Sequence, residues 1–237
     1  MPVDIAANIT AIRERIAAAC ARTGREPASV TFLAVSKHQP PEAVTAVLEA
    51  GLADFAESRV QEAKAKIPLC PGRARWQMIG HLQSNKCRDA VTLFSMIQSV
   101  DGLPLAQELN KQCEKAAKTM PILLEVNVAG EASKFGYRPA ALLADFHALS
   151  RLSRLEIHGL MTIAPYSPIP ERARPFFRGL RELKRECEQL LGAPLPQLSM
   201  GMSGDFEVAI EEGATIVRIG TALFGERPKT LGNQAEN

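Results

Sequence analysis

The sequence predicts an α/β protein, more specifically a (β/α)₈ barrel of the TIM type with an extra helix at its N-terminal end. Eight short apolar segments rich in strand-forming residues alternate with segments of helical periodicity, and this alternation favours a parallel sheet. The chain has 237 residues, close to the length of about 250 residues that is typical of a closed eight-stranded barrel. No linker or shift in composition divides it, so residues 1–237 are expected to form a single domain.

Each predicted strand is followed by a helix or a short helical turn. The first segment, 1–28, has isoleucines at steps of four, three and four residues, which predicts a helix that ends near Gly24. Asp101 is expected to cap the helix after the fourth strand. The strands are predicted at 30–36, 52–56, 75–80, 94–100, 122–128, 155–163, 197–200 and 215–220. The helices are predicted at 40–51, 57–66, 84–91, 101–113, 139–152, 176–190 and 205–212, and residues 226–237 form a C-terminal tail.

The composition excludes several classes of protein. Charged residues make up 23% of the chain, the net charge is +2, and no basic run is interleaved with aromatic residues, so no nucleic-acid partner is expected. No apolar stretch reaches the length of about 18 residues that indicates a membrane span, and the first residues have neither the basic nor the apolar region of a signal peptide, so none is expected. The five cysteines contain no CxxC pair and the four histidines have no metal-binding spacing. A cytoplasmic protein without a metal site is the expectation.

Two glycine-containing segments follow the seventh and eighth predicted strands. These are 199–204 and 218–222, and the corresponding loops of such barrels often hold a phosphate group. Glycine lets a ligand approach the backbone, and the hydroxyl groups of Ser203 and Thr221 can donate hydrogen bonds to an anion. The alternative is that Ser203 is only a helix cap and Gly220 only a turn residue. Asp205 and Glu207 argue against an anion site unless they point away from it.

Lys37 and Arg218 are the two cationic candidates in the predicted barrel. Lys37 ends the first strand directly after an apolar run, where burial and nearby cations would lower its pKa as an imine-forming amine requires. Combined with a phosphate site, this indicates a phosphorylated aldehyde as the ligand. The alternative is a solvated lysine at a strand end. Arg218 stands among apolar residues and needs a buried partner, for which Glu125 is the candidate.

Five motifs resemble the pyridoxal phosphate homeostasis protein family, in family order and over nearly the whole chain. They are Ala34-Val-Ser-Lys37, 79–86 (IGHLQSNK), 158–161 (HGLM), 198–203 (LSMGMS) and 217–225 (VRIGTALFG), and 125–127 (EVN) followed by 133–136 (SKFG) is similar too. The resemblance implies a barrel related to the N-terminal domain of alanine racemase. It implies pyridoxal 5′-phosphate bound as a Schiff base on Lys37, with phosphate around Ser203, Gly220 and Thr221, and Arg218 facing the pyridine nitrogen. Met202 and Ser58 complete the expected cofactor-binding set.

One segment departs from the family pattern. The family has a Phe-Gly-Glu-Asn-Tyr-like run after the second strand, whereas this chain has 55–59 as Phe-Ala-Glu-Ser-Arg. The family asparagine would approach an oxygen on the cofactor ring, and Ser58 takes its place with a shorter side chain, whose reach to that oxygen the sequence leaves open. Ala56 requires a backbone conformation that is allowed to residues other than glycine.

The leading functional hypothesis is a cofactor carrier with no catalytic residues. Family members are thought to buffer vitamin B6 in the cell and to deliver pyridoxal phosphate, which makes PLP-dependent apo-enzymes the expected partners of a monomer or weak dimer. A guanidinium facing the pyridine nitrogen keeps it unprotonated and weakens the ring as an electron sink. The alternative is an enzyme: an amino-acid racemase, another barrel-type PLP enzyme, or a lysine-dependent aldolase. Lys86 and Lys134 are further lysines on which the cofactor could be held.

Overall fold

The sheet is a closed barrel of eight parallel strands that pair in sequence order, with β1 also paired to β8. The computed structural model describes residues 3–225, so the predicted tail 226–237 lies outside the described residues. The strands are β1 Thr31–Val35, β2 Asp54–Glu57, β3 Arg75–Met78, β4 Met96–Val100, β5 Met120–Glu125, β6 Leu155–Met161, β7 Gln197–Ser199 and β8 Ile216–Ile219. The predicted (β/α)₈ fold is therefore confirmed, and every predicted strand is present.

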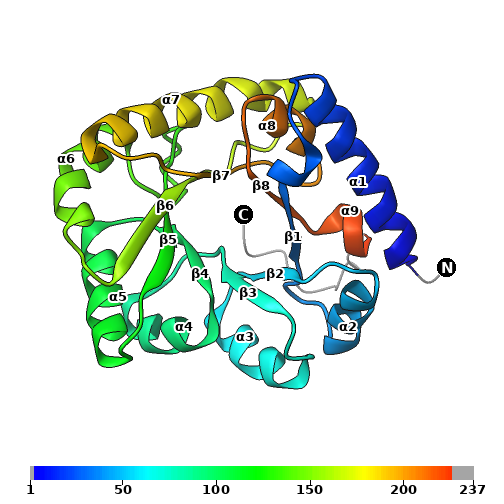
Figure 1. Ribbon diagram of the computed structural model, residues 1–237, viewed down its shortest axis with the longest axis horizontal. Coiled ribbons are helices and arrows are strands. Elements are labelled where there is room, and N and C mark those ends of the chain that lie inside the picture. The colour runs from blue at the N-terminus through cyan, green and yellow to red at the C-terminus, as the bar shows by residue number, and fades with distance from the viewer. Residues whose placement is uncertain (1–2, 226–237) are drawn as a thin grey trace.

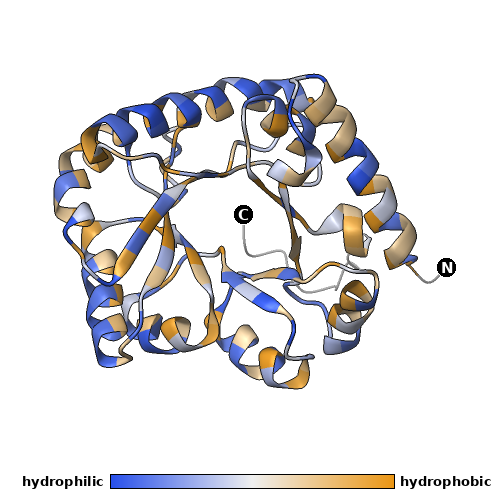
Figure 2. Ribbon diagram, in the orientation of Figure 1, coloured by the Kyte–Doolittle hydropathy of each residue, from blue (hydrophilic) through white to orange (hydrophobic). Residues whose placement is uncertain are grey.

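Helices cover the outside of the barrel, as Figure 1 shows. They are α1 Ile5–Ala21, α2 Pro41–Glu49, α3 Val60–Lys66, α4 Cys87–Leu93, α5 Leu103–Lys115, α6 Pro139–Ser150, α7 Arg174–Leu191, α8 Phe206–Glu211 and α9 Thr221–Phe224. Figure 2 shows α7 as largely hydrophilic, and its buried face is formed by Phe177, Leu180, Leu183 and Cys187. None of the helices in residues 3–225 is long and apolar enough to cross a membrane.

The extra N-terminal helix, α1, packs on the outer layer beside α8 and α9 (Figure 1). Its buried face contains Ile9, Ile12 and Ile16, three of the four isoleucines whose spacing predicted the helix. The side chain of Asp4 accepts a hydrogen bond from the amide of Ala7 at 2.9 Å, which caps the helix start. The helix ends at Ala21, slightly before the predicted end.

Apolar side chains form two separate clusters because successive strand residues point to opposite faces of the sheet. Phe32 and Ala34 belong to the large cluster between the sheet and the helices. Leu33 and Val35 belong to a small cluster inside the barrel, with Ala56, Leu123, Met161 and Ile216. On each strand, the residue two positions after the last inward-facing residue therefore points to the mouth of the barrel.

Two predicted helix starts are wrong. Glu57 was assigned to a helix, but it is the last residue of β2 and is fully buried, and α3 begins only at Val60. Its carboxylate is held inside the protein by hydrogen bonds from Ser36 and Lys66, which local sequence does not reveal. Asp101 does not cap the following helix, because Gly102 is the N-cap of α5. The carboxylate of Asp101 lies instead 3.0 Å from Nδ1 of His81.

Candidate functional site

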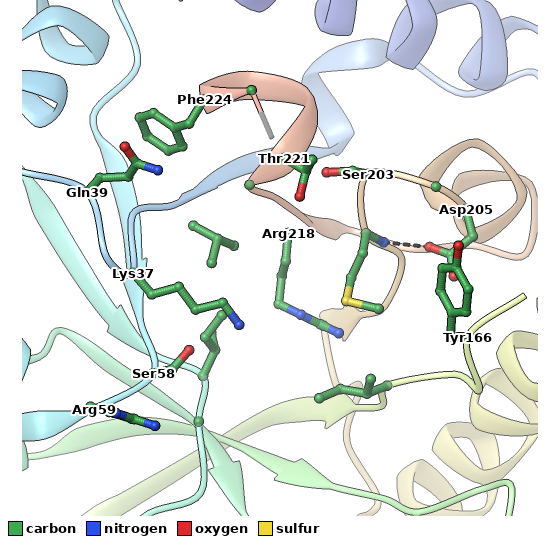
Figure 3. Close-up of a pocket in the computed structure, with 18 of the residues that line it drawn as sticks. Lys37, Gln39, Ser58, Arg59, Tyr166, Ser203, Asp205, Arg218, Thr221 and Phe224 are labelled. Carbon is green, nitrogen blue, oxygen red and sulfur yellow. Dashed lines mark hydrogen bonds between the residues drawn. The ribbon is translucent and has the colours of Figure 1, made fainter. Parts of the chain in front are cut away.

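A cavity of about 650 Å³ opens at the carboxyl ends of the strands. Its wall includes all seven residues that the sequence singled out: Lys37, Ser58, Met202, Ser203, Arg218, Gly220 and Thr221. Figure 3 shows the side chains of Lys37 and Arg218 reaching toward the same space, with Ser203 and Thr221 beside each other on one side of it. Residues far apart in the sequence thus meet at the position where barrels of this type bind ligands.

The alternation of side chains along the strands explains why Lys37 faces the cavity. Leu33 and Val35 point into the barrel, and Lys37 lies two residues further on the same side. Ile216 and Arg218 have the same relation on β8. This alternation accounts for the position of Lys37 on the wall of the cavity that Arg218 also lines.

The backbone on both sides of Lys37 is held by a buried ion-pair network. The ammonium group of Lys66 donates to the carbonyl of Ser36 at 2.7 Å, to Glu57 Oε1 at 2.8 Å and to Glu62 Oε1 at 2.9 Å. The amide of His38 donates to the same oxygen of Glu62. His38 has a positive φ of 64°, which costs conformational energy in a residue other than glycine. The network therefore fixes the residues immediately before and after Lys37.

The two glycine-containing segments approach each other through Ser203, whose hydroxyl accepts a hydrogen bond from the amide of Ala222 at 3.2 Å. Ser203 does not cap the following helix, because the N-cap of α8 is Asp205. Within residues 3–225, the amides of Ser203 and Gly204 have no hydrogen-bond acceptor. Two free amides and the hydroxyls of Ser203 and Thr221 form a set of donors that suits a phosphate group.

Asp205 also lines the cavity, whereas Glu207 is turned away from it. Asp205 Oδ1 accepts from the amide of Met202 at 2.6 Å (Figure 3), so one carboxylate oxygen is occupied by the loop itself. Burial raises the pKa of Asp205, although the Met202 amide and Arg218 lower it. Glu207 pairs with Arg15 on α1 at 3.0 Å. The electrostatic objection to an anion site therefore applies to Asp205 and not to Glu207.

The guanidinium of Arg218 is buried and held by neutral acceptors. It donates to Ser199 Oγ at 2.7 Å and to the carbonyl of Thr162 at 2.8 Å. The expected partner, Glu125, acts on it only through longer-range attraction, so the predicted ion pair is wrong. Burial lowers the pKa of Arg218 to about 10, and the group therefore remains a cationic donor at neutral pH.

The segment that departs from the family pattern fits the barrel without strain. Ala56 is buried, and its φ is not positive, so an alanine is tolerated there. Ser58 lies on the cavity wall. Its backbone is close to Gly80, where an added Cβ would lie only 2.8 Å from Ser58 Cα. Glycine at position 80 is therefore required by the close approach of the second and third strand ends.

Several cavity residues were missed by sequence reasoning. They include Gln39, Arg59, Ile79, Ile163, Tyr166 and Phe224. Ile79 and Ile163 continue the inward-facing rows of β3 and β6, so side-chain alternation could have identified them. Tyr166 stands in a proline-rich loop that has no such signal. Lys134 lines a smaller neighbouring pocket, and Lys86 is not part of either wall.

Comparisons with known proteins identify the family of the chain. The family model described as "Alanine racemase, N-terminal domain" matches residues 6–228. The chain is 46% identical over 226 residues to the pyridoxal phosphate homeostasis protein of Pseudomonas aeruginosa, covering 94% of this chain and 96% of that protein. It is 44% identical to the protein of the same name from Aquifex aeolicus, covering 93% and 97%.

Solved structures with the same fold include two that bear on the family. PipY of Synechococcus elongatus with PLP bound superposes with a TM-score of 0.82 at 36% identity, covering 94% of this chain and 100% of that chain. An alanine racemase from Clostridium difficile superposes at 0.73 with 14% identity, covering 94% of this chain and 57% of that one. The second likeness concerns the fold alone. From the family model and the near full-length identity to its named relatives, the chain belongs to the pyridoxal phosphate homeostasis protein family.

Proposed function

We propose that this chain binds pyridoxal 5′-phosphate in the cavity at the barrel mouth, through a Schiff base on Lys37. The single observation that carries the proposal is the meeting of Lys37, Arg218 and the Ser203–Thr221 donor set in one cavity. The phosphate would lie on Ser203, Gly220 and Thr221, and the pyridine nitrogen would face Arg218. The structure of PipY with PLP bound, in a relative of 36% identity, supports the choice of cofactor.

The chemistry required of Lys37 is limited. Its amine would condense with the aldehyde of the bound cofactor to a carbon–nitrogen double bond, with loss of one water molecule. The reverse reaction with water releases the cofactor, so the bond suits storage as well as retention. The Lys66 network acts on the backbone beside Lys37 and so keeps its side chain directed at the cavity.

We further propose that the protein holds and delivers the cofactor and takes part in vitamin B6 homeostasis, with PLP-dependent apo-enzymes as recipients. Arg218 supports a role without catalysis, because a guanidinium donates to the pyridine nitrogen and does not protonate it. The names of the relatives from Pseudomonas aeruginosa and Aquifex aeolicus support the homeostatic role.

Reductive labelling tests the proposal. The purified protein should be yellow, and borohydride should fix the cofactor's mass on the peptide that contains Lys37. The Lys37→Ala variant should lose that label, while Lys86→Ala, a change outside both pockets, should keep it. A label found wholly on Lys86 or Lys134 would contradict the assignment.

A racemase-type enzyme is the second candidate, and one observation favours testing it. Tyr166 lines the cavity and is 92% exposed, which places its phenol at the rim. A tyrosine can act as a general acid or base. The hydrogen-exchange experiment described in the Discussion separates this candidate from a carrier.

A further inference from the structure

A second, smaller pocket of about 200 Å³ adjoins the cofactor cavity. The two share Ile79, Gly80, His81 and Ile163 as lining residues. The rest of the smaller pocket, called the side pocket below, is lined by Glu125, Val126, Asn127, Ser133, Lys134 and Phe135. None of these six residues lines the cofactor cavity, so the side pocket has a wall of its own.

That wall is a folded loop with defined internal bonds. The Nδ2 group of Asn127 donates to the carbonyls of Glu131 at 2.8 Å and Lys134 at 3.1 Å. Gly136 has a φ of 109°, and an added Cβ would lie 2.8 Å from the amide nitrogen of Asn127. The loop is therefore held against the end of β5 by contacts that only glycine permits at this position.

Two hydrogen-bond acceptors of the side pocket have no donor. Glu125 and Asn127 are 7% and 6% exposed, and Glu125 Oε2 and Asn127 Oδ1 are buried without a hydrogen-bond partner in the part of the chain that the structure describes. Both residues are on the same side of an extended segment because they are two positions apart. Buried acceptors without donors reduce stability, so a ligand that supplies donors would bind favourably.

The charges around Glu125 favour a cation. Burial and the neighbouring Asp101 raise the pKa of Glu125 to about 7, against the attraction of Arg218. The ammonium group of Lys134 is paired with Glu131 at 3.0 Å and does not neutralise Glu125. A positive charge beside Glu125 would favour its ionised form.

Much of the remaining lining is apolar, although Ser133 and His81 also belong to it. Ile79 and Ile163 contribute aliphatic surface, whereas the side chain of Val126 packs into the large cluster on the other side of the strand. The ring of Phe135 stacks on His81 with the ring centroids 3.6 Å apart. A volume of about 200 Å³ corresponds to roughly seven times the volume that one water molecule occupies in the liquid. A molecule with a charged head and a short hydrocarbon chain matches both the size and the lining.

We propose that the side pocket binds a small primary amine in its ammonium form, with the ammonium donating to Glu125 and Asn127 and a short alkyl chain lying against Ile79 and Ile163. An ammonium has three donors, enough for both unpaired acceptors. This site is additional to cofactor binding, and it would place an amine next to the cofactor cavity.

Calorimetric titration with n-butylammonium chloride tests the proposal. The protein is used first free of cofactor and then after borohydride reduction, which prevents the amine from reacting with the aldehyde. Saturable binding with one site per chain is expected in both forms, and neither n-butanol nor butyrate should bind comparably. Because the first form contains no cofactor, a failure of the Lys37 assignment would leave this result unaffected.

Glu125→Gln keeps the shape of the side chain and removes its charge, so we expect it to weaken butylammonium binding about tenfold or more. Glu186→Gln, on the exposed face of α7, is the matched control and should bind as the unaltered protein does. Thermal unfolding of each variant verifies that it is folded. Equal binding by Glu125→Gln, no saturable binding, or a crystal soaked in the amine that shows only water at Glu125 would overturn the proposal.

Discussion

Ser203 and Thr221 differ in what their substitution removes from the proposed phosphate site. Ser203→Ala removes one hydroxyl donor and the acceptor for the Ala222 amide, and we expect it to weaken cofactor binding by about 1.5–3 kcal/mol. Thr221→Pro removes a hydroxyl and a backbone donor, and proline is tolerated at the first position of α9, so its effect should be larger. Equilibrium dialysis against the free cofactor measures both, with Thr221→Val as the variant that keeps the amide. Unchanged affinity in both would place the phosphate elsewhere.

Glu125 should make stability depend on pH. Its pKa is raised to about 7 from an ordinary value of 4.5, mainly by burial. Between these values the folded state binds more protons than the unfolded state, so the free energy of unfolding falls as pH rises through this window and levels off above it. Glu125→Gln should therefore be more stable than the unaltered protein at pH 8 by up to about 3 kcal/mol, and by only about 1 kcal/mol at pH 5.

Urea denaturation of both proteins at pH 5 and pH 8 measures this difference. Parallel pH profiles for the two proteins would show that the carboxyl of Glu125 is not the titrating group.

Individual site residues could be predicted from sequence where strand alternation or a glycine-containing loop marked them. Lys37 and Arg218 follow apolar strand residues, and both line the cavity. Their partners could not be predicted in the same way. Arg218 is held by Ser199 Oγ on β7 and by the carbonyl of Thr162, which follows β6. The sequence indicated a carboxylate instead, with Glu125 on β5 as the candidate.

The connection between β2 and α3 explains both a prediction error and a structural support of the site. Glu57 reads as a helical residue because it begins a polar run, yet it ends β2 with its carboxylate on Ser36 and Lys66. Lys66, the last residue of α3, is 6% exposed, although lysine at a helix end is usually solvated. The inward direction of these two side chains depends on how β1, β2 and α3 pack together, and the local sequence gives no sign of it.

Lys66→Met should lower the free energy of unfolding by about 3–5 kcal/mol, because it leaves Glu57 buried without its cation. Adding Glu57→Gln should restore part of this loss. Lys64→Met is the matched control on the same helix: Lys64 is exposed and pairs with Asp89, and surface pairs contribute at most about 1 kcal/mol. Urea denaturation measures the three variants.

A second readout distinguishes positioning of Lys37 from general stability. At a low temperature where the Lys66→Met variant remains folded, borohydride should fix the cofactor on Lys37 more slowly than in the unaltered protein, because the Ser36 carbonyl has lost its donor. Labelling at the unaltered rate would mean that the network stabilises the barrel without directing Lys37.

The barrel as a whole was the most predictable feature. Eight alternating strand and helix units in 237 residues are compatible with few architectures. The strands pair in sequence order, which is the simplest order to infer from a sequence. The docking of α1 against α8 and α9 was not predictable, since an amphipathic face indicates burial without naming the surface that buries it. The meeting of the β7 and β8 loops was expected because consecutive parallel strands lie side by side with their carboxyl ends at the same edge of the sheet.

The final prediction concerns catalysis by the loaded protein. Arg218 donates to the pyridine nitrogen in the proposed arrangement, so the ring gains little capacity to stabilise negative charge at the α-carbon of an amino acid. General acid or base catalysis is worth about 10²- to 10⁴-fold in rate, and Tyr166, the tyrosine on the cavity wall, is almost wholly exposed to water. We therefore expect L-alanine and other amino acids to be neither racemised nor transaminated faster than by free cofactor.

Deuterium exchange at the α-carbon in heavy water, followed by proton NMR, is the sensitive assay for catalysis. Transfer is measured separately: an apo-enzyme added to the loaded protein should gain activity as it receives the cofactor. Tyr166→Phe separates the two candidate functions. In a carrier it should change neither exchange nor transfer by more than the scatter of the measurement, because the exposed phenol does no proton transfer there. In a racemase-type enzyme, exchange should be fast in the unaltered protein, slow in Tyr166→Phe and absent in Lys37→Ala, and that pattern would replace the carrier with an enzyme.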